Sequence, residues 1–282
     1  MRQAFDREPI GFSHNLSGLD LFTLESLHAL AEKMADSRDY FIAASAPLPG
    51  TPFFSVPMVD YKPPEAIEKL DMGAYRILLK RAENHDRRFR ALLDTLSKQV
   101  IEFLGCLANQ KIVRLESGIL ISSAATITPF HCDPEIGFFS QIEGEKTYHV
   151  YSPTVISERE LERFSIAGPV ALAPVELNGR NSVLEYVHSL SAGKGFHQPQ
   201  NSPHWVETGK SRSISYTFVF ETDATRALGR TRAFNHYLRK FRLSPAALGA
   251  RPAVDALKSD AMRAAIPARQ LAARIVNKVR FG

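Results

Sequence analysis

The sequence predicts a mainly β protein with flanking helices, and three observations lead to this expectation. Between about residues 112 and 222, short β-prone segments alternate with turns. On both sides of this stretch, apolar residues recur at helical spacing instead. The chain also contains no internal repeat and no low-complexity linker. Several short antiparallel strands flanked in this way favour a small barrel with helical shoulders.

The residues before the β-rich stretch are expected to form two helices, a loop and a strand. In residues 14–36, leucines recur at helical spacing after candidate capping residues, which predicts a helix. The density of proline in residues 47–52 indicates a loop. Tyr75–Lys80 has the β-prone composition of a strand, and Arg87–Leu104 carries apolar residues at helical spacing again.

The middle and the end of the chain follow the same division. Strands are expected at residues 119–122, 126–129, 138–142, 147–151, 183–187 and 213–220. Helices are expected at residues 226–241, 254–263 and 265–279. We therefore predict three parts. Residues 1–111 form a shoulder that contributes to the barrel, 112–222 form the barrel core, and 223–282 form a basic helical region suited to dimerisation.

The composition is that of an ordinary globular protein. The apolar share is 44% and the charged share is 23%, so a disordered chain is not expected. The two cysteines, Cys106 and Cys132, are too few for a disulfide framework and suit a reducing compartment. The N-terminus lacks the apolar core of a secretory leader, and no stretch approaches the roughly 18 uncharged apolar residues of a membrane span. These features predict a cytoplasmic protein.

The charge is distributed unevenly along the chain. From Arg226 to the C-terminus there are thirteen Lys and Arg against two Asp, so the rest is acidic although the total is +5. Such a basic region could bind nucleic acid or a partner. It could equally line the solvated faces of helices. No helix-turn-helix or aromatic-interleaved basic stripe accompanies the charge, which favours the second interpretation.

The segment Thr-Pro-Phe-His-Cys-Asp at residues 128–133 carries the first candidate ligands of a metal. Residues i and i+2 of a strand point to the same face, so His131 and Asp133 are expected to project together while Cys132 points away. Pro134 cannot continue a β-ladder, so the strand should end just past the pair, at the mouth of the barrel. A His-x-Asp pair alone is common by chance.

A second cluster, Pro-Gln-Asn-Ser-Pro-His at residues 199–204, supplies a third candidate ligand. It resembles the Pro-x-Gly-x-x-His turn of cupin barrels, with Asn201 at the Gly position. Asn tolerates left-handed backbone geometry better than most residues. The turn would place His204 on a strand that faces the first pair. Two histidines and one carboxylate can bind ferrous iron and leave the opposite face open for oxygen chemistry.

A hairpin after the His-x-Asp pair is expected to direct a lysine into the barrel. The turn should lie at Glu143-Gly144, because Gly supplies the positive φ that such a turn requires. Lys146 then shares a face with Tyr148 and Val150, where a cation is costly unless an anion meets it. A dicarboxylate cosubstrate would be such an anion. The alternative is a surface lysine that follows a turn.

Three further residues near the site depend on local geometry. Strict alternation puts Thr128 on the face opposite to His131. A bend, for example at Pro129, is therefore needed before the Thr128 hydroxyl can donate to the same carboxylate. His149 alternates with the inward residues and is expected to face away from the barrel. His197 precedes the turn and is expected to support the site or to be an ordinary loop histidine.

Together these motifs resemble the JmjC and cupin-like iron(II)/2-oxoglutarate oxygenases. The resemblance rests on Thr-Pro-Phe-His-Cys-Asp-Pro-Glu, Phe-Phe-Ser-Gln-Ile-Glu-Gly-Glu-Lys and the Pro-His-Trp-Val turn, and it covers about residues 112–222. The motifs are similar to those of bacterial cupin-like proteins often labelled transcriptional regulators, and of the asparaginyl hydroxylase that acts on the hypoxia-inducible factor. This resemblance implies a double-stranded β-helix (jelly-roll) core and an oxidoreductase, a hydroxylating dioxygenase that uses Fe(II) and 2-oxoglutarate.

The resemblance also implies roles for individual residues. The iron ligands and the catalytic centre would be His131, Asp133 and His204. The cosubstrate-binding residues would be Thr128 and Lys146, which would hold the distal carboxylate of 2-oxoglutarate, and Thr217. Gly137 stands where members of the family often carry an Asn near the metal, so no side chain there would meet the proximal carboxylate.

The missing side chain at Gly137 and the basic tail favour an alternative function. The chain could be a non-catalytic cupin module that binds a metal or small ligand and acts as a regulatory protein. If the chain is an oxygenase, the resemblance implies a protein side chain as substrate. Apolar stripes that include Leu238, Phe241 and Leu257 suggest a homodimer formed through the C-terminal helices. No nucleic-acid motif and no membrane segment are expected.

Overall fold

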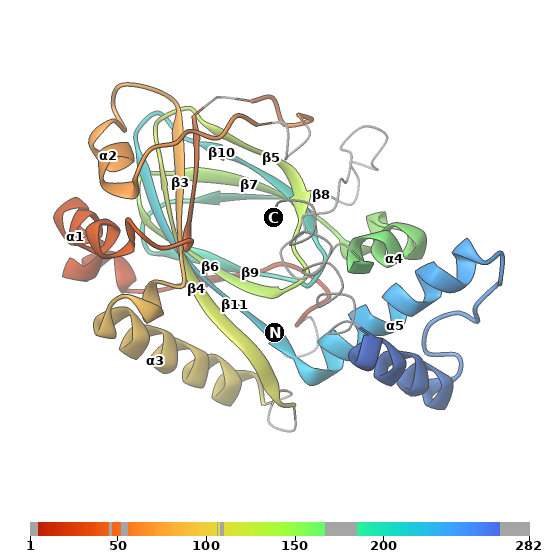
Figure 1. Cartoon of the computed structure of the whole chain (residues 1–282). Helices are drawn as coiled ribbons and strands as arrows, with labels where there is room; N and C mark the ends of the chain where they lie inside the picture. The colour runs from red at the N-terminus through yellow and green to blue at the C-terminus, as the bar shows by residue number, and fades with distance from the viewer. Residues whose placement is uncertain are drawn as a thin grey trace, which may run out of the picture. The chain divides into compact units, whose positions relative to one another are not determined.

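The computed structural model (Figure 1) describes residues 5–44, 47–51, 56–105, 107, 110–166 and 185–265. Within these residues the strands form two antiparallel sheets. The seven-stranded sheet has the order β1 (Ile10–Ser13), β9 (Lys194–Gln198), β6 (Ile136–Glu143), β11 (Ser213–Thr222), β4 (Ile112–Ser122), β3 (Tyr75–Lys80) and β2 (Tyr40–Ala44). The four-stranded sheet has the order β5 (Ile127–Cys132), β10 (Pro203–Thr208), β7 (Lys146–Tyr151) and β8 (Glu185–Leu190).

Most neighbours in the two sheets are not consecutive strands, which is the arrangement of a jelly roll. β1 pairs with β9, β6 pairs with both β9 and β11, and β10 lies between β5 and β7. The two sheets face each other in Figure 1, and helices accompany the seven-stranded sheet. The expected fold class, mainly β with flanking helices and a double-stranded β-helix core, is confirmed.

Two apolar cores follow from the alternation of side chains along the strands. The larger core lies on the outer face of the seven-stranded sheet, where α1 (Leu24–Met34), α2 (Pro63–Glu68) and α3 (Arg87–Leu104) cover it. The smaller core lies between the two sheets and contains Phe139, Tyr148, Val150, Leu190, Phe196 and Val206. Because neighbouring residues point to opposite faces, Phe138 joins the outer core and Phe139 the inner one.

The described chain forms two compact units. One consists of Met1–Val155 and Pro174–Glu221, and it contains both sheets. The other consists of Ile156–Ala173 and Thr222–Gly282, and it contains α4 (Glu158–Ile166), α5 (Asp223–Lys240) and a helical segment at 252–265. Within this second unit Arg239 binds the buried carboxylate of Glu162 at 2.8 Å. The division into three parts at residues 111 and 222 stays a prediction.

Most predicted elements are present, and several are longer than predicted. β4 begins at Ile112 rather than near residue 119, and β5 continues to Cys132. The helix predicted over 14–36 begins only at Leu24, because the Thr23 hydroxyl accepts from the Ser26 N–H and caps the helix there. Short helical turns in the described part of the chain lie at Leu16–Gly18, Asp20–Phe22, Ala82–Asn84 and Pro153–Val155.

Some expectations fall on residues outside the described part of the chain. Cys106, the start of the strand predicted at 183–187 and nearly all of the helix predicted at 265–279 belong to this group. The short elements β1, β2, β9, α2 and α4 were not predicted from the sequence. None of the helices in the described ranges has both the length and the apolar character needed to span a membrane.

The hairpin between β6 and β7 turns at Gly144, as predicted. Gly144 has φ +70°, and a Cβ atom at this position would collide with the carbonyl oxygen of Arg212. Only glycine satisfies both conditions without strain. The turn fixes the face on which β7 begins, so Lys146, Tyr148 and Val150 are all buried while Thr147 and His149 are more exposed.

Candidate metal centre

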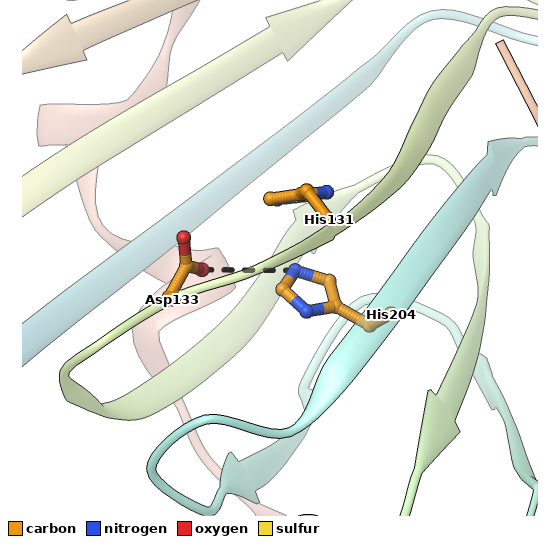
Figure 2. A group of neighbouring side chains, drawn as sticks. All are labelled: His131, Asp133 and His204. Atoms are coloured by element: carbon orange, nitrogen blue, oxygen red, sulfur yellow. Dashed lines mark ion pairs between the residues drawn. The ribbon is translucent and has the colours of Figure 1, made fainter. Parts of the chain in front are cut away.

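Figure 2 shows His131, Asp133 and His204 grouped at the ends of β5 and β10. One possible ligand atom from each residue lies within 4.8 Å of the other two. His204 Nε2 is 3.7 Å from Asp133 Oδ2, and the two imidazole rings have centroids 4.1 Å apart. Across the described ranges this is the one group of three or more His, Cys, Asp or Glu residues that could hold a metal ion.

The register between β5 and β10 brings the two histidines together. His204 pairs directly with His131, so the two side chains emerge on the same face of the four-stranded sheet. The next pair is Val206 with Thr128, so the register shifts by one residue between them. This is a β-bulge on β5, and it supplies the bend that the sequence analysis required. Thr128 therefore shares the inner face with His131 instead of opposing it.

Asp133 follows the end of β5, and the turn before β10 holds its backbone. The strand ends at Cys132, as Pro134 predicted. Asn201 has φ +59°, the left-handed geometry expected at this position of the turn. Its backbone N–H donates to the carbonyl of Asp133 at 2.9 Å. The hydrogen bond from the left-handed residue Asn201 thus connects the loop that carries Asp133 to the turn that leads to His204.

Both histidines are oriented by hydrogen bonds to the backbone. Nδ1 of His131 donates to the carbonyl of Pro129 at 2.7 Å, and Nδ1 of His204 donates to the carbonyl of Ser202 at 3.1 Å. In each case the acceptor lies two residues before the histidine. With the proton on Nδ1, the lone pair is on Nε2, which is the arrangement that orients histidine ligands in metal sites. The donor set and its orientation therefore fit a divalent metal such as iron.

Burial keeps the His131 imidazole neutral. Desolvation, followed by the neighbouring charge of His204, lowers the pKa of His131 to about 4, although Asp133 opposes this effect. A neutral imidazole is the form that binds a metal. The two histidines are buried, whereas the Asp133 side chain is 32% exposed. The carboxylate therefore lies on the solvent side of the group, at the mouth of the barrel.

Lys146 lies inside the barrel as predicted, on the face of Tyr148 and Val150. Its residue is only 3% exposed, and no hydrogen bond or ion pair to its ammonium is found within the described residues. Burial, followed by the positive charge of Arg76, lowers the pKa of Lys146 to about 7. A desolvated cation of this kind has a strong preference for an anion.

The other predicted cosubstrate residue lies on the inner face as well. Thr217 of β11 alternates with Tyr216 and Phe218, which belong to the outer core. Its hydroxyl donates to the carbonyl of Phe138 at 3.0 Å. The cosubstrate-binding roles of Thr128, Lys146 and Thr217 stay predictions.

His149 and His197 make contacts outside the candidate metal centre. His149 stacks on Trp205 with ring centroids 3.7 Å apart, and its Nδ1 lies 2.7 Å from Glu185. His197 stacks on Phe5, and its Nδ1 donates to the carbonyl of Gly137 at 3.0 Å. Neither belongs to the candidate ligand group. The outward position of His149 agrees with the sequence analysis, whereas His197 lies buried in strand β9 rather than in a loop.

Arg76, a buried arginine on β3, was not predicted from the sequence to lie near the site. Its positive charge contributes to the lowered pKa of both Lys146 and His131, which agrees with a position near the candidate site. The available signal was an arginine between apolar residues in the predicted strand at Tyr75–Lys80. The sequence of that strand alone does not show which of its two faces lies inside the barrel.

Solved structures of YcfD, a ribosomal oxygenase from Escherichia coli, are similar to this chain. The complex with cobalt and 2-oxoglutarate has a TM-score of 0.51 at 16% sequence identity, and the match covers 93% of this chain and 64% of that chain. The complex with cobalt and succinic acid has a TM-score of 0.51 at 14% identity, with the same coverage. The chain thus spans just under two thirds of the length of these proteins.

At this level of identity the likeness shows the fold alone. No protein-family model matches the sequence, and no curated protein matches it either. The two antiparallel sheets form a fold similar to that of these solved structures, so the fold that the motif resemblance implies is confirmed.

If the three residues bind one ion, single changes should abolish tight metal binding. We expect His131→Ala, Asp133→Ala and His204→Ala each to weaken Co(II) binding by about 100-fold or more, since even residues that only orient a ligand contribute roughly 10- to 100-fold. Calorimetric titration of the metal-free protein measures this. His149→Ala is the matched control and should retain wild-type affinity. Unchanged metal affinity in the first two variants would exclude this site.

The left-handed residue in the turn should be replaceable by glycine but not by a β-branched residue. Asn201→Gly should change the free energy of unfolding by less than about 1 kcal/mol, because glycine adopts this φ freely. Asn201→Val should cost about 1–3 kcal/mol and weaken Co(II) binding, because the strained turn also holds the Asp133 backbone. Thermal melts and Co(II) titration of both variants test this. Equal behaviour of the two would contradict the role of the turn.

Proposed function

We propose that this chain is an Fe(II)- and 2-oxoglutarate-dependent oxygenase that hydroxylates a C–H group. The observation that carries the proposal is the pair of histidines whose Nδ1 atoms both donate to backbone carbonyls beside Asp133. The buried ammonium of Lys146 on the same inner face supports a carboxylate ligand. Similar folds have been solved with cobalt and 2-oxoglutarate, which agrees with this assignment.

The residues of the chain divide the work of such a reaction. His131, Asp133 and His204 would hold the metal, which when bound supplies the oxidation of a C–H group by O2 coupled to oxidative decarboxylation of 2-oxoglutarate to succinate and CO2. Lys146 would bind the distal carboxylate and fix the orientation of the cosubstrate. The inner core, which includes Phe139, Phe196 and Val206, excludes water from this region.

The substrate class is a protein side chain in this proposal. The motif resemblance implies it, and the similar solved structures are described as a ribosomal oxygenase. A homodimer and a cytoplasmic location belong to the same proposal. Within the second unit, Phe241 and Leu257 are strongly exposed, which supports an apolar contact with a second copy.

Gly137 favours a second candidate, a non-catalytic cupin module that binds a metal or small ligand. Gly137 pairs with Val219 and Gln198 on the inner face of β6. A Cβ atom there would meet Gln198 at 3.7 Å, which is an ordinary contact, so the missing side chain is not forced by packing. This site therefore has no side-chain partner for a ligand at that position.

Succinate formation distinguishes the two candidates. The protein would be loaded anaerobically with Fe(II), mixed with 2-oxoglutarate and O2, and followed by NMR. An oxygenase should form succinate even without its substrate, at a slow rate, and the His131→Ala variant should not. If the protein binds the metal but neither binds nor consumes 2-oxoglutarate, the oxygenase proposal fails and the binding module remains.

The charge of Lys146 should make cosubstrate binding depend on pH. Its pKa in the ligand-free protein is about 7, so the ammonium that an anion needs is present below pH 7 and lost above it. Affinity for 2-oxoglutarate should therefore fall between pH 7 and 9, by up to about 10-fold per pH unit. Calorimetry on the Co(II)-loaded protein measures it. Lys146→Met should bind weakly and without this dependence; a flat wild-type profile would contradict the role of Lys146.

A further inference from the structure

Arg76 is a buried cation that the described residues leave unpaired. It is 8% exposed, and its Nε is buried without a hydrogen-bond partner. No ion pair between its guanidinium and a carboxylate is found within the described ranges. Buried guanidinium groups are normally paired, because their desolvation is costly. Such a residue therefore points to a ligand that completes its environment.

The side chain of Arg76 faces the space between the two sheets. Its neighbours Ile77 and Leu79 belong to the outer core, so alternation puts Arg76 and Leu78 on the opposite face. Leu78 pairs with Leu120, which packs against the inner core. Directly paired residues share a face of the sheet. Arg76 therefore lies on the inner face, in line with Leu78.

Arg76 and Lys146 lie at the same end of the barrel. Arg76 pairs with Ser122, the last residue of β4. The chain then turns through Thr126, whose hydroxyl donates to the Thr208 hydroxyl at 3.0 Å. Thr208 pairs with Lys146, the first residue of β7. Consistent with this path, the charge of Arg76 contributes to the lowered pKa of Lys146.

Two buried cations on one inner surface, without a carboxylate partner in the described part of the chain, repel each other, although the Lys146 ammonium lies over the Phe139 ring, 5.8 Å from its centroid. An anion between them would offset both the repulsion and the cost of desolvation. A guanidinium offers parallel N–H donors that match the two oxygens of a carboxylate, whereas an ammonium offers a point charge. The pair is therefore better suited to a carboxylate than to a neutral ligand.

We propose that Arg76 and Lys146 together bind the distal carboxylate of a 2-oxo dicarboxylate, and that Arg76 makes the site selective for dicarboxylates over 2-oxo monocarboxylates. This inference rests on the proposed function and deepens it. It gives Arg76 direct contact with the cosubstrate. It also predicts that Arg76 does not contact the metal.

The test measures dissociation constants on the Co(II)-loaded protein. Arg76→Gln should weaken the binding of 2-oxoglutarate by about 10- to 100-fold, the contribution typical of a hydrogen bond to a charged group. Arg76→Lys, which keeps the charge but not the paired donors, should lie between this variant and the wild type. Affinities for Co(II) and for 2-oxopentanoate, which lacks the distal carboxylate, should stay within about threefold of wild type, since neither contacts Arg76.

The melting temperature of the metal-free protein is the control for folding. Because Arg76 is unpaired without a ligand, Arg76→Gln should melt no lower than the wild type. A clear loss of stability would show that Arg76 has a structural partner and would overturn the inference. Equal 2-oxoglutarate binding by Arg76→Gln and wild type would overturn it too, while the oxygenase proposal would stand.

Failure of the proposed function gives a different result. If the Co(II)-loaded wild type does not bind 2-oxoglutarate, the oxygenase proposal is lost. Sulfate then serves as the probe of the metal-free protein. If sulfate raises the melting temperature of the wild type but not that of Arg76→Gln, the anion site formed by Arg76 and Lys146 is retained. Equal shifts in the two melting temperatures would overturn it.

Discussion

The pairing of His131 with His204 across β5 and β10 is the constraint on which the candidate site depends. It sets both imidazoles on the inner face, and the one-residue bulge beside it moves Thr128 to the same face. A slip of one residue in this register would turn one histidine outward and separate the ligands. The turn at Asn201 stabilises the register, because its N–H holds the Asp133 backbone at the same end of the two strands.

The inner surface of the barrel combines a neutral ligand set with unpaired positive charge. Desolvation keeps His131 neutral and able to bind a metal, while it leaves the Lys146 and Arg76 cations in an unfavourable state without a ligand. The chain thus accepts a cost in stability in the ligand-free form. This is the pattern of a binding site whose polar groups are arranged for a guest rather than for the fold.

Local rules made part of the site predictable. The spacing of His131 and Asp133, the positive φ at Gly144 and the turn at Asn201 are each determined by a few neighbouring residues, and the structure agrees with all of them. Helix boundaries and edge strands were harder to predict. The apolar pattern begins before Thr23, but the Thr23 cap makes the helix begin only after it, and β1 is a strand because it pairs with β9. Arg76 was missed because the face of the sheet on which its side chain lies depends on pairing with Ser122, 46 positions further along the chain.

The two ends of the proposed cosubstrate are treated differently by this chain, and the difference bears on Gly137. A 2-oxo dicarboxylate has two features that proteins can hold, the chelating end at the metal and the distal carboxylate. Gly137 offers nothing at the first end, whereas Arg76 and Lys146 would give the second end two cations. Binding energy placed at a remote carboxylate can orient the reacting end just as well, provided that the ligand is held at both points. In this proposal the loss at Gly137 is offset by Arg76, so the missing side chain argues less strongly against turnover than the sequence alone suggests.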